Sequence, residues 1–163
     1  MINHADIPAP EIKLEILHRT IDRLCDAGWE YIGMDHFALP DDDLVQSRYD
    51  GTLQRNFQGY STHRYCDLVA LGVSAIGGVA NGFTQNAVTT MEYEALIERG
   101  ELPIRKGLVV DADVQLRAAV IQSLMCYDEL SFDDFGKQHG IDFCDYFADE
   151  IKRLRPLASD LSL

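Results

Sequence analysis

The sequence has few basic residues and no long apolar run, and each shortage excludes a class of partner. Lysine and arginine together number 14, against 27 aspartates and glutamates, so the formal net charge is −13. Nucleic-acid backbones are bound through clustered basic side chains, so we expect no nucleic-acid partner. A bilayer-spanning helix needs about 20 consecutive apolar residues, and no run approaches that length, so we expect no membrane partner. The opening MINHADIPAPEIK lacks the basic and apolar regions of an export signal, which favours a cytoplasmic protein.

Cysteine is also sparse, and its spacing excludes the usual metal motifs. Zinc and iron–sulfur sites generally use cysteines that lie a few residues apart, and no such pair occurs here. We therefore expect free thiols and no metal site within this chain. The four cysteines are Cys25, Cys66, Cys126 and Cys144.

What is present predicts an α/β piece, residues 1–90, followed by a helical piece, residues 91–163. In the segment 14–24 a large aliphatic residue recurs every three or four positions, which indicates a helix that packs on an apolar surface. The aromatic and β-branched run 29–34 follows at once and predicts a strand. This helix-then-strand order is typical of an α/β unit.

The segment between that strand and residue 90 predicts shorter elements. Residues 40–51 begin with proline and three aspartates and reach a glycine, which predicts a brief helix. Residues 52–65 are polar and aromatic without a clear period, so we expect an ordered loop. Residues 67–78 are apolar with glycines, which favours a buried strand that another backbone or a ligand can approach, and 83–86 predicts a last short strand.

The remainder of the chain predicts helices. Residues 91–99 form one, and Asp111 has the place of an N-cap before a second. Ser131 and Gly140 bracket a third, and a fourth follows with an aromatic and aliphatic stripe over 143–154. The apolar stripe expected on the second helix consists of Val114, Ala118, Ile121 and Met125.

Three arginines form a positive island in this acidic chain. Arg48, Arg55 and Arg64 lie between positions 46 and 66, where the only acidic residue is Asp50. Guanidinium groups bind carboxylates and phosphates through paired, charge-assisted hydrogen bonds, so the island indicates an acidic ligand. The alternative is that these arginines form surface ion pairs with the aspartates at 41–43, which would contribute little to stability.

A histidine beside an aspartate is a further candidate for chemistry. Asp35 and His36 follow the strand predicted at 29–34, and the carboxyl ends of strands are where α/β folds assemble their sites. A carboxylate raises the basicity of an imidazole, so the pair could serve in proton transfer. Neighbouring residues on a strand point to opposite faces, however, and a structural hydrogen bond is the alternative role for His36.

Several segments together resemble the oxygen-independent coproporphyrinogen III oxidases, a radical S-adenosylmethionine family of haem biosynthesis. They are DIPAPEIKLEIL, YIGMDHFALPDDDL, GTLQRNFQGYST, LGVSAIG and IKRLRPLA, and they extend over nearly the whole chain. The related haem-chaperone branch lacks the RNFQGY run, so the oxidase branch is favoured.

This resemblance implies an α/β fold of a particular kind: the C-terminal part of an incomplete α/β (TIM-like) barrel, followed by a helical, winged-helix-like domain. It also implies S-adenosylmethionine and a 4Fe-4S cluster as cofactors. The family holds that cluster with a CxxxCxxC motif, which this sequence does not contain. The expectation is therefore an internal piece of the enzyme, truncated at both ends and inactive alone, from a family of monomers.

The resemblance further implies a reaction and a set of site residues. The family oxidatively decarboxylates two propionates of coproporphyrinogen III to vinyl groups, giving protoporphyrinogen IX. Matched positions place Phe57, Gln58 and Ile76 at the cofactors, with Gln58 needed for activity. The tetracarboxylate substrate provides a partner for Arg48, Arg55 or Arg64, without distinguishing among them.

Two other functions stay open at this stage. The chain could retain a tetrapyrrole site and act as a haem carrier related to the haem-chaperone branch. The helices on either side of Gly140 also resemble a helix-turn-helix. The acidic residues of its second helix favour a packing module over a DNA-binding one.

Overall fold

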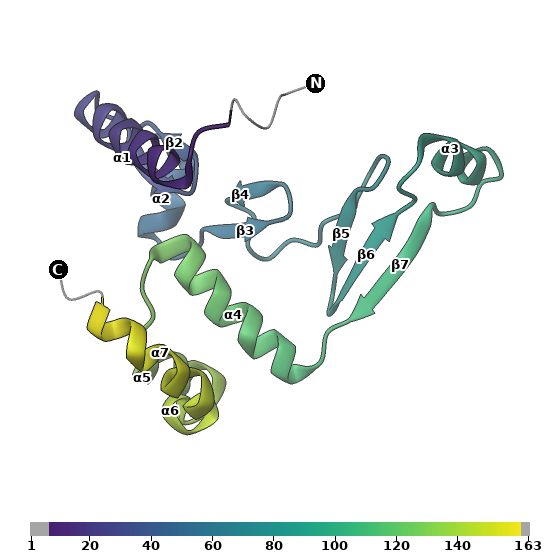
Figure 1. The fold of residues 1–163 in the computed structure, drawn as a ribbon. Coiled ribbons are helices and arrows are strands. Elements are labelled where there is room, and N and C mark those ends of the chain that lie inside the picture. Colours follow the sequence, from purple (N-terminus) through teal and green to yellow (C-terminus); the bar gives the residue numbers. More distant parts are fainter. Residues whose placement is uncertain (1–6, 161–163) are drawn as a thin grey trace. The chain divides into compact units, whose positions relative to one another are not determined.

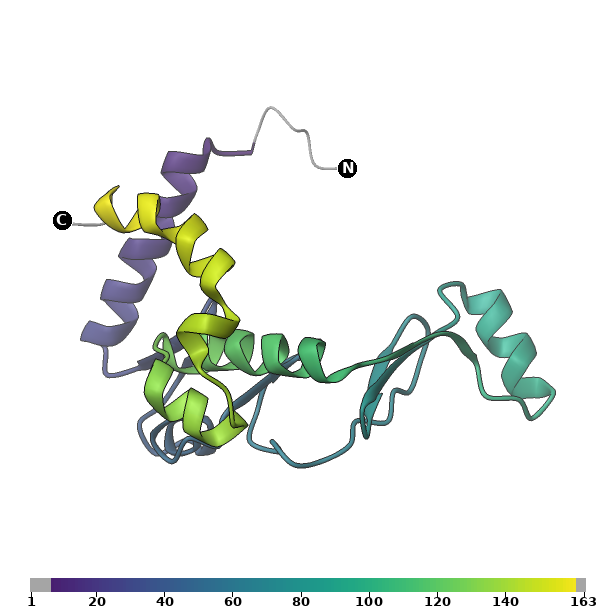
Figure 2. The ribbon, with the colours of Figure 1, turned by 90° about the horizontal axis from the view of Figure 1, so that it is seen from below.

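The computed structural model describes residues 7–160, which fall into two compact units that divide between Val110 and Asp111. Figure 1 shows the elements of both units, and Figure 2 shows them from a second direction. The first unit contains α1 (Pro10–Asp26), β1 (Glu30–Gly33), β2 (His36–Ala38), α2 (Asp43–Tyr49), β3 (Gln54–Asn56), β4 (Gly59–Ser61), β5 (Ile76–Val79), β6 (Gly82–Asn86), α3 (Thr90–Glu98) and β7 (Ile104–Val109). The second contains α4 (Ala112–Tyr127), α5 (Phe132–His139), α6 (Phe143–Tyr146) and α7 (Ala148–Asp160).

Helix α1 confirms the helix predicted over 14–24 and ends in a Schellman motif. Trp29 N–H donates to Leu24 O at 3.0 Å and Gly28 N–H to Cys25 O at 2.9 Å, while Gly28 has a φ of +89°. No residue of α1 is buried, but Ile21 and Leu24 of the predicted stripe are half-buried, so the described residues cover its apolar face only in part.

The strand predicted at 29–34 is confirmed as β1, but its environment is different from the expected α/β unit. β1 pairs antiparallel with β2 through a tight turn at Met34 and Asp35. Asp35 therefore follows the C-terminal end of β1 as predicted, but in a hairpin turn, and His36 begins the antiparallel return strand and not a site at a sheet edge. The brief helix predicted over 40–51 is confirmed as α2, whose N-cap Asp42 accepts a hydrogen bond from Leu44 N–H at 2.8 Å.

The loop predicted over 52–65 is wrong, because its centre is a β-hairpin. β3 and β4 pair antiparallel, with Phe57 and Gln58 as the two residues of the connecting turn. The side-chain oxygen of Asn56 closes this turn by accepting from Gln58 N–H at 2.9 Å and Gly59 N–H at 3.2 Å. Each strand has only three residues, which is too short for an alternating pattern to be visible in the sequence.

The remaining strands form an antiparallel sheet in the order β5-β6-β7. Of the strand predicted over 67–78, only the last residues form a strand, as part of β5. Leu68, at the start of the predicted segment, instead pairs with Gly78 through two backbone hydrogen bonds of 2.7 and 2.9 Å. The strand predicted at 83–86 is confirmed within β6. β7 was not predicted. Helix α3 connects β6 to β7, and both views show it at one end of the sheet (Figures 1 and 2).

The first unit mixes helices and strands, consistent with the predicted α/β class, and every strand pairing described is antiparallel. The compact first unit extends to Val110 because β7 pairs with β6. The domain boundary predicted near residue 90 is a different division, between the barrel and the helical domain that the family resemblance implies. It stays a prediction. Within residues 7–160, no helix has both the length and the apolar character that crossing a bilayer requires.

The second unit is built around three phenylalanines. Phe135, Phe143 and Phe147 are each at most 7% exposed, and aliphatic side chains of α4 and the connecting segments pack against them. The stripe predicted on α4 is on the wrong face, since Ile121 is 58% exposed. Apolar residues occur on all sides of α4, so periodicity alone does not identify the buried face. The residues that pack on the phenylalanines are Leu116, Ala119, Val120, Leu130, Ile141 and Ile151.

The predicted helix boundaries in this unit are largely confirmed. Asp111 caps α4 by accepting from Val114 N–H at 2.9 Å, and Ser131 caps α5 by accepting from Asp134 N–H at 3.3 Å. Gly140 ends α5 in the left-handed conformation, with a φ of +69°. The single helix expected from residue 143 is two helices, α6 and α7, which divide at Phe147.

Candidate functional site

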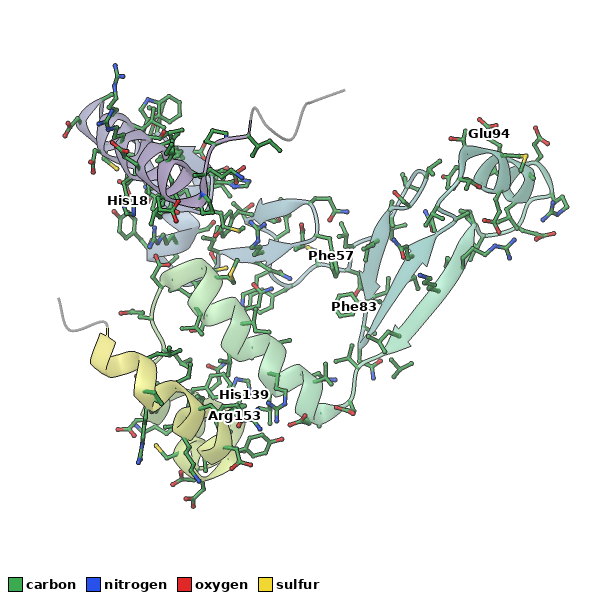
Figure 3. The ribbon with its side chains drawn as sticks, in the orientation of Figure 1. His18, Phe57, Phe83, Glu94, His139 and Arg153 are labelled. Atoms are coloured by element: carbon green, nitrogen blue, oxygen red, sulfur yellow. The ribbon has the colours of Figure 1, made fainter. Side chains whose placement is uncertain are left out.

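The β3–β4 turn rests on the β5–β6 part of the sheet and brings the predicted site residues together. Gln58 Nε2 donates to the backbone oxygen of Ile76 at 3.4 Å. The Phe57 ring meets the Phe83 ring with centroids 5.8 Å apart and an interplanar angle of 88°. Figure 3 shows Phe57, from the hairpin, and Phe83, from the sheet, close to one another. Gln58 and its turn neighbour Phe57 therefore lie beside Ile76.

The side chains at this turn are open to solvent on one side. Phe57 is 65% exposed and Phe83 41% exposed. A perpendicular ring contact covers at most one face of Phe57, so the other face is available for stacking by a planar group. The Ile76 carbonyl and the Gln58 amide add an acceptor and a donor beside that ring.

The three arginines contact three different groups. Arg48 Nη1 donates to Tyr31 O at 2.5 Å, which ties α2 to β1. Arg64 Nη1 donates to Gly51 O at 2.6 Å. Arg55 lies over the Tyr60 ring, with its guanidinium carbon 5.0 Å from the ring centroid. Each guanidinium thus has a local contact that orients it.

His36, the first residue of β2, packs against β4 of the β3–β4 hairpin. Its Nδ1 is 2.9 Å from Asp35 Oδ1, a contact that the turn position of Asp35 permits. Its ring meets the Tyr60 ring edge-on, with centroids 5.1 Å apart. A Cβ added to Gly59 would lie 3.2 Å from His36 Nε2, so the imidazole packs directly against this glycine. The packing of the ring against Tyr60 and Gly59 favours a structural role for His36, through ring contacts and not through the predicted hydrogen bond.

A further polar contact lies beside the first hairpin. Tyr49 OH donates to Glu30 Oε2 at 2.8 Å. This hydrogen bond, together with the negative charge of Glu30, raises the pKa of Tyr49. The phenol therefore stays protonated and acts as a donor that links α2 to β1.

Sequence reasoning placed Phe83 in a strand but not in the site. Its contact with Phe57 depends on the β5–β6 register and on the position of the hairpin above it, and neither is encoded by a local pattern. The only local signal was an aromatic residue among the polar and small residues of β6.

The described cysteines and carboxylates do not fit an iron–sulfur cluster. Among residues 7–160, no three histidine, cysteine, aspartate or glutamate side chains gather closely enough to hold a metal ion. Cys25, Cys66 and Cys144 are exposed and Cys126 is buried, and none of the four forms a disulfide. Cluster ligands are therefore not provided by this part of the chain.

Comparison with solved structures identifies a class. The chain matches a radical SAM enzyme with a TM-score of 0.87 and 41% sequence identity, over 98% of this chain and 37% of the solved one. That enzyme is the coproporphyrinogen III oxidase of Escherichia coli. No model of a protein family matches the chain.

The sequence comparison gives the same answer. The chain is 51% identical over 159 residues to the oxygen-independent coproporphyrinogen III oxidase of Pseudomonas aeruginosa, and 41% identical over 159 residues to that of Escherichia coli. Each match covers 98% of this chain but 35% of the relative, so the chain spans about a third of their length. The resemblance that the motifs predicted is confirmed: the chain is homologous to a segment of oxygen-independent coproporphyrinogen III oxidases.

Proposed function

We propose that this chain is part of an oxygen-independent coproporphyrinogen III oxidase, which oxidatively decarboxylates two propionates of coproporphyrinogen III to give protoporphyrinogen IX. The observation that carries the proposal is the meeting of Phe57, Gln58 and Ile76, three positions implied by the sequence motifs, through one hydrogen bond and a shared sheet surface. In this proposal residues 1–90 complete a TIM-like barrel, and 91–163 form the winged-helix-like domain of a cytoplasmic, monomeric enzyme.

The roles of the residues follow from their contacts. S-adenosylmethionine, which with a 4Fe-4S cluster held elsewhere in the enzyme would supply the radical chemistry, would lie against the turn. Phe57 would stack on its planar adenine, and the Ile76 carbonyl and Gln58 amide would fix the orientation of the adenosyl group. Among residues 7–160, no side chains are assigned to hold the cluster.

The arginines would bind the acidic substrate. A guanidinium has five N–H donors, so a single bond to a backbone oxygen leaves Arg64 able to bind a carboxylate as well. Arg55, stacked on Tyr60 in the hairpin that also bears the turn, lies in the element nearest the proposed cofactor position. We assign substrate propionates to Arg55 first, with Arg48 and Arg64 as further partners.

A chimera tests this function. The matching segment of the Escherichia coli oxidase is replaced by this chain, and conversion of coproporphyrinogen III to protoporphyrinogen IX is followed by chromatography. We expect an active chimera in which Gln58→Ala lowers kcat/KM by about 10- to 100-fold, because misplaced reactants cost rates of this order. Gln85→Ala is the matched control, since Gln85 Nε2 also donates to a backbone oxygen, that of Ser74, at 3.3 Å.

The outcomes separate clearly. A well-folded chimera with the cluster in place but no product would contradict the proposed function. Equal activity in Gln58→Ala and Gln85→Ala would retain the function and remove Gln58 from the site.

A further inference from the structure

We propose that Phe83 is a positioning residue that holds the Phe57–Gln58 turn in the geometry needed to receive a planar adenine ring. This inference rests on the proposed function for the identity of the ligand. The positioning itself rests on contacts within residues 1–110.

The first contact is between Phe83 and the sheet beneath it. The register pairs Phe83 of β6 with Gly78 of β5. A Cβ added to Gly78 would lie 3.3 Å from Cε1 and 3.4 Å from Cδ1 of Phe83, so the ring lies directly over the glycine. An added Cβ at position 78 would press on the ring and require it to shift.

The second contact is between Phe83 and the turn. The rings of Phe57 and Phe83 meet almost perpendicularly, while Gln58 donates to Ile76 O, two residues before Gly78 in β5. The turn is thus fixed by one apolar and one polar contact on the same strand pair. Figure 3 shows Phe83 reaching from the sheet toward Phe57.

The turn needs this support because its own hairpin is small. β3 and β4 have three residues each, and a short two-stranded hairpin is marginally stable in water by itself. Without the Phe83 ring, the turn itself would be attached to the sheet by the 3.4 Å hydrogen bond from the exposed Gln58 amide. Phe57 would then lose its fixed orientation relative to the Ile76 carbonyl.

The primary test uses the full chain without ligand. Ring resonances of Phe57 and the side-chain amide of Gln58 are recorded by NMR in wild type, Phe83→Leu, Phe83→Tyr and Gly78→Ala. An aromatic pair of this kind shifts a local equilibrium by about 2- to 10-fold, so Phe83→Leu and Gly78→Ala should move both signals toward averaged, unstructured values. Phe83→Tyr retains the ring and should resemble wild type.

Phe132→Leu is the matched control. Phe132 is 43% exposed, close to the exposure of Phe83, and also belongs to an aromatic pair, with Phe143 at 4.3 Å. Its replacement should leave the signals of Phe57 and Gln58 unchanged. Unmoved signals in Phe83→Leu, or equal movement in Phe132→Leu, would overturn the positioning role.

The chimera then links position to ligand. Phe83→Leu should raise the KM for S-adenosylmethionine by about 2- to 10-fold with a smaller effect on kcat, and Phe83→Tyr should restore it. If Phe83→Leu leaves this KM unchanged while the chimera is active, the ligand assignment is wrong. If the parent chimera is inactive, the proposed function fails, whereas the NMR result still decides the positioning.

Discussion

Residues 111–163 bury three phenylalanines against one another, whereas residues 1–110 leave the aromatic side chains of their candidate site exposed. Phe135, Phe143 and Phe147 form the core of the C-terminal unit. In the N-terminal unit, Phe57 and Phe83 meet on the surface above a glycine-bearing strand. Packing of side chains therefore forms the core of the C-terminal unit. Close approach to glycine backbone forms the candidate site of the N-terminal unit.

The difference has a functional meaning. A buried aromatic core fixes one arrangement of helices and has little capacity to accept a ligand, since interiors are packed at crystal-like density. Glycines in β5 instead let a second backbone segment and an aromatic ring lie directly on the strand. The surface that results combines ordered backbone with exposed rings, which is what binding of a planar ligand requires.

The largest expected effect is the removal of a core ring. Phe143→Ala should lower the free energy of unfolding of residues 111–163 by about 3–5 kcal/mol, because the ring contacts Phe132, Phe135 and Phe147. Hydrogen exchange of the α5 and α7 amides measures this loss. Fluorescence of Trp29, the single tryptophan, reports separately on residues 1–110.

Two outcomes would break the comparison. The free energy of unfolding reported by Trp29 fluorescence should change little in Phe143→Ala. If it falls by as much as the free energy reported by hydrogen exchange in α5, the two units do not differ in the way proposed. Phe132→Ala should cost clearly less than Phe143→Ala, because Phe132 is partly exposed. Equal losses would mean that the aromatic core is not the main support of this unit.

The next effect comes from adding a methyl group where two backbones meet. A Cβ on Gly77 would lie 2.8 Å from the backbone oxygen of Leu68, so Gly77→Ala should cost about 1–3 kcal/mol and speed the exchange of Leu68 and Gly78 N–H. Gly107→Ala is the control, since it is in the same sheet and its nearest neighbour would be Phe83 O at 3.9 Å. Similar losses in both variants would show that β propensity, and not backbone approach, is responsible.

Sequence patterns predicted helices well because helix ends have local chemistry. Gly28, Asp111, Ser131 and Gly140 each form the cap that their residue type favours. The missed elements are short strands. β7 reads IRKGLV, is exposed along its whole length, and has no alternation of buried and exposed positions from which a strand could be identified.

The cofactor side of the candidate site was predictable only through the resemblance. Phe57, Gln58 and Ile76 were named by motif position, and their meeting depends on a hairpin that the sequence pattern indicated as a loop. Arg55 was named from the charge pattern, but its stacking on Tyr60 follows from the β3–β4 register and was not predicted. Contacts across registers are set by the whole fold, so residue type and spacing do not reveal them.

The smallest expected effect concerns the surface ion pairs of the C-terminal unit, where charge supports the aromatic core. Arg117 Nε lies 2.8 Å from Asp113 Oδ2, and its Nη1 lies 2.7 Å from Glu150 Oε1. The same guanidinium lies over the Phe147 ring at 5.6 Å. Tyr146 OH donates to the other oxygen of Asp113 at 2.7 Å, which raises the pKa of this phenol.

Arg117→Ala tests how much this charge network adds. Hydrogen bonds from Arg117 lower the pKa of Asp113 and of Glu150. Because both pKa values are depressed on folding, their stabilisation is complete above the ordinary carboxyl range near pH 4 and is lost as the pH falls through the folded values. In Arg117→Ala, carboxyl NMR titration should show both pKa values rising and a weaker loss of stability in acid, whereas Arg99→Ala should leave both unchanged. Water screens these exposed charges, so the change in unfolding free energy should be smaller than in either preceding test. An effect comparable to the loss of Phe143 would mean that charge, and not ring packing, holds the C-terminal unit together.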